Sequence, residues 1–176
     1  TGEPTECALV NYGAKLGIDK TTVENKLPRV EEVPFDSGRK MMTTLHADKE
    51  SGKVIQYTKG APDEVLKKCT LIMENGVERD ITSEDKEKIL KANKEMADKA
   101  LRVLMASQKV YEKMPEKVST DVENNLCFLG LVGMIDPVRP EVKAAIEECN
   151  SAGITPVMIT GDHVDTAAAI GRELGI

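Results

Sequence analysis

The sequence is poor in aromatic residues and in metal-binding side chains. It contains no tryptophan, three tyrosines, two phenylalanines and two histidines, and its four cysteines form no CxxC pair. This composition argues against a metal cluster and against a disulfide framework. Apolar neighbours surround the cysteines, so we expect buried, reduced thiols in a cytosolic protein. The four are Cys7, Cys69, Cys127 and Cys149.

Long apolar runs and a strong positive charge are also missing. The longest apolar run, residues 126–135, is about half of the roughly twenty residues that a membrane-spanning helix needs. We therefore expect no bilayer crossing by this chain, although a large cytosolic loop of a membrane protein would have the same composition. The net charge is −6 with a pI near 5.1, and the basic residues are scattered among acidic ones. This pattern argues against a nucleic-acid-binding surface.

The first half of the chain predicts helices and paired strands. Apolar residues spaced three and four apart predict a helix that ends at Gly17, and from residue 30 to 59 the period changes to two, which predicts strands joined by polar turns. The second of these strands runs into Lys59-Gly60-Ala61-Pro62, a strand–turn–helix junction. A longer helix is expected after Thr82, and a strand over 103–107.

The second half predicts a different arrangement. An apolar strand over 126–135, a helix over 140–152, a strand over 155–159 and a further helix follow one another. This alternation is typical of a parallel α/β sheet. With 176 residues and 40% hydrophobic composition, we expect one complete domain and part of another, divided near Asp136.

Several residues are candidates for binding, each with a structural alternative. Lys59, Gly60 and Ala61 would suit an anionic, planar ligand, or they form a turn with a surface lysine. Phe35, beside a polar turn, could stack on a base or anchor the core.

Four charged residues and one loop are further candidates. Glu6 could accept a hydrogen bond from an adenine amino group or stabilise its helix N-terminus, whereas Arg39, Lys40 and Arg102 are phosphate ligands or solvated charges. Thr160-Gly161-Asp162 follows a predicted strand, where it could bind a phosphoryl group or cap the next helix.

Taken together and in order, six motifs resemble the type II P-type ATPases, and the calcium-pump branch in particular. The motifs are Gly2-Glu3-Pro4-Thr5-Glu6, Phe35-Asp36-Ser37-Gly38-Arg39-Lys40, Lys59-Gly60-Ala61-Pro62, Leu101-Arg102-Val103-Leu104, Asp136-Pro137-Val138-Arg139 and Met158-Ile159-Thr160-Gly161-Asp162. Six matches in one order are far more specific than any single one, and they span nearly the whole chain.

The resemblance implies an α/β fold of two parts. Residues 1–135 would form a nucleotide-binding domain with an antiparallel sheet flanked by helices, and residues 136–176 part of a phosphorylation domain of the haloacid dehalogenase type. The implied ATP pocket is lined by Glu6, Phe35, Ser37, Arg39, Lys40, Lys59, Gly60, Ala61 and Arg102. The implied hinge and phosphoryl-handling loop are Asp136, Pro137, Arg139, Thr160, Gly161 and Asp162.

Two departures from the family pattern limit what the chain can do. Many calcium pumps carry an arginine where this chain has Ser37, and Arg39 is the nearest replacement. The phosphorylated aspartate of D-K-T-G-T and the magnesium-binding G-D-G-x-N-D are both missing from the sequence. We therefore expect no complete catalytic or metal site: the chain would bind ATP with Mg²⁺ but would not turn it over.

In the intact pump, the resemblance implies transfer of the γ-phosphoryl group to that missing aspartate, coupled to cation transport, with calcium as the favoured ion. The implied partners are ATP and the phosphorylation, actuator and transmembrane domains, at the cytosolic face of a membrane, with the plasma membrane favoured. Two alternatives stay open: a fragment of a haloacid-dehalogenase-type phosphatase, and a non-catalytic nucleotide-sensing module.

Overall fold

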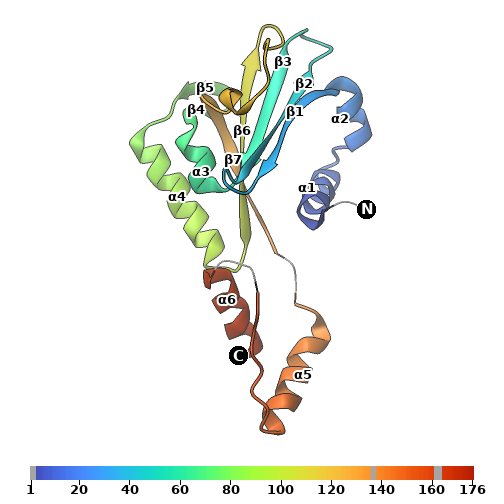
Figure 1. Cartoon of the computed structure of the whole chain (residues 1–176), viewed down its shortest axis with the longest axis vertical. Coiled ribbons are helices and arrows are strands. Elements are labelled where there is room, and N and C mark those ends of the chain that lie inside the picture. Colours follow the sequence, from blue (N-terminus) through green and yellow to red (C-terminus); the bar gives the residue numbers. More distant parts are fainter. Residues whose placement is uncertain (1–2, 136–137, 161–163) are drawn as a thin grey trace. The chain divides into compact units, whose positions relative to one another are not determined.

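The computed structural model describes residues 3–135, 138–160 and 164–176, which divide into two compact units (Figure 1). The first unit comprises Thr1–Ile89 and Leu104–Val132, and the second comprises Leu90–Val103 and Gly133–Ile176. The helices are α1 (Pro4–Lys15), α2 (Lys20–Lys26), α3 (Pro62–Lys67), α4 (Ser83–Ala97), the 3-10 helix η1 (Thr120–Val122), α5 (Pro140–Ser151) and α6 (Val164–Leu174). The strands are β1 (Arg29–Asp36), β2 (Met41–Ala47), β3 (Val54–Gly60), β4 (Cys69–Glu74), β5 (Val77–Asp80), β6 (Arg102–Tyr111) and β7 (Leu126–Met134).

The strands form one seven-stranded sheet in the order β1-β2-β3-β6-β7-β4-β5. The pairs β1–β2, β2–β3, β3–β6 and β4–β5 are antiparallel, whereas β4 and β7 are parallel. This mixed α/β arrangement, a largely antiparallel sheet flanked by helices, confirms the predicted fold class. The partial haloacid dehalogenase-type segment over 136–176 stays a prediction. The hairpin of β4 and β5 was not predicted, although its turn residues Asn75 and Gly76, both with positive φ, are a strong hairpin signal.

The two-residue period of β2 and β3 corresponds to their burial. In β3 every second residue from Val54 to Gly60 is buried, and the residues between them are half-buried. Met41, Thr43 and Leu45 of β2 follow the same rule. Successive side chains of a strand point to opposite faces, so one face of this sheet is closed and the other is more open.

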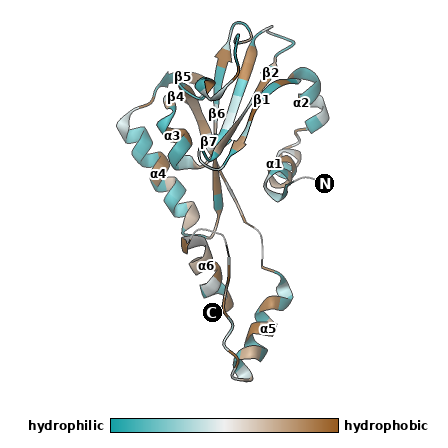
Figure 2. Ribbon diagram, in the orientation of Figure 1, coloured by the Kyte–Doolittle hydropathy of each residue, from teal (hydrophilic) through white to brown (hydrophobic). Residues whose placement is uncertain are grey.

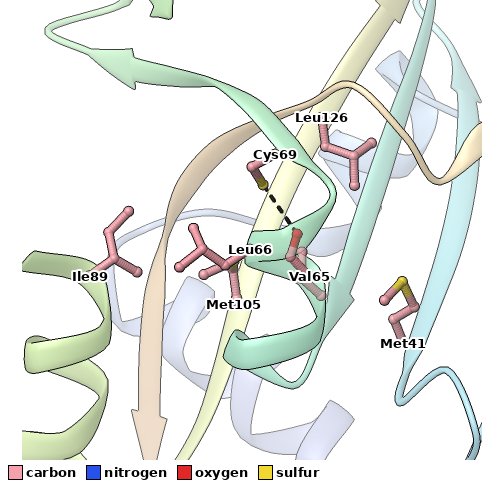
Figure 3. Close-up of a cluster of buried hydrophobic side chains, with 7 residues drawn as sticks. All are labelled: Met41, Val65, Leu66, Cys69, Ile89, Met105 and Leu126. Atoms are coloured by element: carbon pink, nitrogen blue, oxygen red, sulfur yellow. Dashed lines mark hydrogen bonds between the residues drawn. The ribbon is translucent and has the colours of Figure 1, made fainter. Parts of the chain in front are cut away.

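The apolar core of the first unit lies between α3, α4 and the sheet (Figure 3). Pro62 occupies the first turn of α3, where its missing N–H costs nothing, and Val65 and Leu66 are buried. The Cys69 thiol donates to the Val65 carbonyl at 3.4 Å. Helix α4 is mostly hydrophilic along its length, and its buried residue is Ile89 (Figure 2). The core residues are Met41, Val65, Leu66, Cys69, Ile89, Met105 and Leu126.

Two of the four cysteines match the expectation of burial. Cys69 and Cys127 are buried, Cys149 is half-buried, and Cys7 is exposed. The expectation was wrong for Cys7 because α1 buries none of its residues.

Burial of Cys69 predicts a pH dependence of stability. Desolvation raises the pKa of this thiol to about 12, whereas its ordinary value is 9.0. The folded state therefore favours the neutral thiol, so its contribution to stability is complete below pH 9 and is lost as the pH rises toward 12. We expect the free energy of unfolding in urea to fall more steeply above pH 9 in the wild type than in Cys69→Ala. Equal slopes in the two proteins would show that the buried thiol is not the cause.

The second unit contains one departure from the predicted elements. Helices α5 and α6 form as expected, with Ile146 buried in α5. Residues 155–159 form no strand, and the side chains of Val157 and Ile159 are 77% and 94% exposed. The predicted strand is wrong for this structure because a strand requires a hydrogen-bonded neighbour, and no described residue pairs with this segment. The predicted domain boundary at residue 136 stays a prediction.

Candidate functional site

The pairing of three strands gathers the candidate residues at one end of the sheet. Asp36 pairs with Met41, Met41 pairs with Gly60, and Gly60 pairs in turn with Met105. Phe35 and Lys40 precede the first two of these residues in the chain, and Ala61 follows the third. Phe35, Lys40 and Ala61, of which the last is distant in the sequence, are thus neighbours at this end of the sheet.

The backbone approaches itself closely at Gly60. A Cβ atom on this residue would lie 2.3 Å from the Lys40 carbonyl oxygen and 2.6 Å from the Met41 Cβ. The same Lys40 carbonyl accepts a hydrogen bond from the Ala61 amide at 2.9 Å, and Lys40 itself has a φ of 55°. Only glycine allows this contact, which fixes the turn before β2 against the start of α3.

A register shift in β1 determines which way Phe35 faces. Val33 pairs with Thr43, but Asp36 pairs with Met41, so one extra residue lies between them in β1. Without the shift, Phe35 would share the closed face of Val33; with it, Phe35 shares the face of Met42. A β-bulge commonly redirects a side chain in this way. Phe35 is accordingly 63% exposed, which is unusual for a large aromatic side chain.

A charged pair lies on the same face as Phe35. Lys59 pairs with Met42 across β2 and β3, and its ammonium group donates to the carboxylate of Glu6. The Lys59 side chain is 29% exposed and that of Glu6 is 48% exposed. This ion pair joins α1 to β3, so Glu6, which is distant in the sequence, is brought to the candidate site.

Arg39 lies on the other side of the sheet. Its guanidinium donates to both carboxylate oxygens of Glu123 at 2.6 Å, and its second terminal nitrogen donates to the Pro34 carbonyl at 2.7 Å. Thr43, on the closed face, donates to the same carboxylate at 2.9 Å. The structure does not bring the Arg39 guanidinium together with Lys59.

The closed face carries a buried polar network around Glu123, which is 2% exposed. Thr43 and Thr58 share a hydrogen bond of 2.7 Å, and the Gln56 amide donates to the Thr58 hydroxyl at 3.0 Å. The Tyr111 hydroxyl donates to the Gln56 carbonyl oxygen at 2.7 Å. No buried side-chain polar atom among the described residues lacks a partner, as a stable polar network requires. Sequence analysis missed Glu123, since nothing distinguishes it from other acidic residues before an apolar strand.

Comparison with known proteins identifies the family. Residues 1–141 match the family model described as P-type ATPase, cytoplasmic domain N. The chain belongs to this family. The resemblance inferred from the six motifs is therefore confirmed.

Three bacterial relatives of this N domain are named as calcium-transporting ATPases. The chain is 50% identical to calcium-transporting ATPase 1 of Bacillus cereus over its whole length. It is 43% identical to calcium-transporting ATPase 1 of Lactococcus lactis and 41% identical to calcium-transporting ATPase lmo0841 of Listeria monocytogenes, over 99% of the chain in each case. The chain spans about a fifth of the length of these relatives (20%).

The other candidate residues of the N-domain chain are distributed over both units. Ser37 and Lys40 are exposed in the turn between β1 and β2. Arg102 is exposed at the start of β6 and belongs to the second unit, with Arg139 and Thr160, both also exposed. Four predicted residues lie outside the described part of the chain: Asp136, Pro137, Gly161 and Asp162.

The described part of this N-domain chain contains neither a candidate metal site nor a candidate membrane-spanning helix. In residues 3–135, 138–160 and 164–176, no three acidic, histidine or cysteine side chains are grouped so that they could hold a metal ion. Within the same ranges, no helix combines the length and apolar character that a membrane crossing needs.

Proposed function

We propose that this chain is the ATP-binding part of a P-type cation-transporting ATPase, with the site on the open face at the Phe35–Lys59 end of the sheet. The exposed Phe35, turned out of the core by the register shift in β1, is the observation that carries the proposal. An adenine ring stacked on this exposed side chain would remove part of its apolar surface from water.

The residues around Phe35 suit the remainder of the nucleotide. Lys59 and Lys40 supply positive charge, and Glu6 supplies an acceptor for an exocyclic amino group. Gly60, which packs against the Lys40 carbonyl, and Ala61, whose amide donates to it, fix the backbone beside these side chains. Ser37 in the adjacent turn can donate a hydroxyl hydrogen bond but no charge. We assign Arg39 to holding this turn, because its partner Glu123 is 2% exposed and its guanidinium also donates to Pro34, whereas the Glu6 partner of Lys59 is 48% exposed.

Magnesium would enter with the triphosphate. The described residues offer no acidic group arrangement for the ion, and phosphate oxygens are ligands that Mg²⁺ commonly uses. In the intact pump, phosphoryl transfer depends on positioning and on neutralising charge. This chain would contribute the positioning of the nucleotide, and the D-K-T-G-T aspartate, missing from this sequence, would be the acceptor.

We propose cation transport, and calcium as the cation, for the intact protein. The names of the three bacterial relatives support calcium, and relatives named for potassium or for sodium and potassium support cation transport more generally. The phosphorylation, actuator and transmembrane domains of the pump would be the partners of this chain. It would lie at the cytosolic face of a membrane, for which we favour the plasma membrane.

Substitution of Lys59 tests the proposed site. Lys59→Met keeps the aliphatic stem but removes the charge, and we expect calorimetry to show ATP binding at least about tenfold weaker than in the wild type, which corresponds to about 1.4 kcal/mol. No release of inorganic phosphate is expected from either protein. Lys53→Met is the matched control, because Lys53 precedes β3 and pairs with Glu112 at 2.8 Å at the opposite end of that strand. Equal ATP affinity in all three proteins would refute the placement of the site.

A further inference from the structure

We propose that Glu123 is a positioning residue for the nucleotide site, acting through Arg39 on the segment that carries Phe35. This inference rests on the proposed function, because it concerns the affinity of the same site. Glu123 directly follows η1 and is separated from Arg39 by 84 positions in the sequence. Arg39 lies in the turn between β1 and β2, and Glu123 lies between η1 and β7, yet the two side chains are in contact.

The contact is built as a specific pair. A single guanidinium nitrogen of Arg39 reaches both oxygens of Glu123 at 2.6 Å, and the Thr43 hydroxyl supplies a third hydrogen bond at 2.9 Å. The Glu123 side chain is 2% exposed and that of Arg39 is 24% exposed. A buried carboxylate is stable only when its partners stay in place, so Glu123 restricts the Arg39 side chain to one position.

From that position, the Arg39 side chain contacts the residues on both sides of Phe35. Its second guanidinium nitrogen donates to the carbonyl of Pro34, the residue before Phe35, at 2.7 Å. Its Nε lies 4.0 Å from the carboxylate of Asp36, the residue after Phe35. The register shift in β1 that exposes Phe35 falls in this same stretch. Arg39 thus stabilises the irregular backbone that Phe35 needs in order to face outward.

Glu123 does not touch a ligand in this arrangement. It contacts Thr43, which pairs with Thr58 on the closed face, whereas Phe35 and Lys59 lie on the open face. The proposed effect of Glu123 on the nucleotide therefore passes through the backbone of residues 34–36. This separation makes the role of Glu123 distinguishable from that of a binding residue.

A double-mutant cycle on the 176-residue chain tests the route. Glu123→Gln and Arg39→Lys should each weaken ATP binding by about five- to tenfold in calorimetry. In the Phe35→Ala background, the same two substitutions should change the dissociation constant by less than about twofold. Their effect on the melting temperature should be the same in both backgrounds. Glu112→Gln, which breaks the exposed pair with Lys53, should leave ATP affinity unchanged.

Three outcomes would overturn the inference. Unchanged ATP affinity with a lowered melting temperature would mean that the pair serves stability alone. Equal losses of affinity with and without Phe35 would mean that the pair acts on the ligand by another route. Absence of ATP binding by the wild type would refute the proposed function itself, and the inference with it. If Glu123→Gln does not fold, Arg39→Lys, which keeps the charge on a surface turn, decides between these outcomes.

Discussion

Phe35→Ala is expected to weaken ATP binding by about five- to 140-fold, because stacking of a base on an aromatic side chain contributes about 1 to 3 kcal/mol. The folded state should hardly change. Phe35 is 63% exposed, and substitutions at exposed positions usually change the free energy of unfolding by less than about 0.5 kcal/mol. Calorimetric titration with ATP and urea unfolding of the same samples separate the two effects.

The matched control for Phe35 is another exposed apolar residue remote from the site. Val77 is 66% exposed on β5, the strand at the opposite edge of the sheet. Val77→Ala should leave ATP affinity and stability unchanged. If Phe35→Ala lowered stability by several kcal/mol and left ATP affinity intact, Phe35 would be a structural anchor, the alternative that the sequence left open.

Gly60→Ala should destabilise the fold and weaken ATP binding together. The added methyl group would lie 2.3 Å from the Lys40 carbonyl oxygen, and this oxygen belongs to the backbone, so strands β2 and β3 must separate locally. Overpacking of this kind costs about 1 to 3 kcal/mol. Movement of Lys40 would also displace the turn that precedes Met41. Urea unfolding and ATP titration measure both consequences.

Gly130→Ala is the control for this substitution. Gly130 lies in β7, and a Cβ atom there would meet no heavy atom within 4 Å. The smaller entropy of the unfolded chain should make this variant neutral or more stable by about 0.4 to 1 kcal/mol. A Gly60→Ala variant as stable as Gly130→Ala would contradict the close contact between residues 40 and 60.

The elements that follow from local patterns could be predicted from the sequence. Alternation of buried and half-buried residues defines β2 and β3, and Pro62 marks the start of α3. The polar segment 48–52 indicates a turn because it separates two alternating runs. These features depend on residues close in the sequence, so their physical cause is visible there.

The features that position the candidate site depend on pairing between distant residues. Phe35 faces outward because β1 shifts its register against β2. Pro34 indicates an edge strand or a bulge, but the size of the shift depends on pairing with β2. The partnership of Arg39 with Glu123 crosses 84 positions. Residues 155–159 have the composition of a strand, yet a strand forms only where a neighbouring strand accepts and donates hydrogen bonds.

The most direct test of the proposed ATP site is a map of backbone amide shifts in the 176-residue chain during titration with Mg-ATP. We predict saturable shifts concentrated at Phe35, Ser37, Lys40 and residues 59–61, with smaller changes at Glu6. The amides of β5, at the far edge of the sheet, should not move. Shifts confined to other strands, or no saturable shift at millimolar nucleotide, would contradict the account.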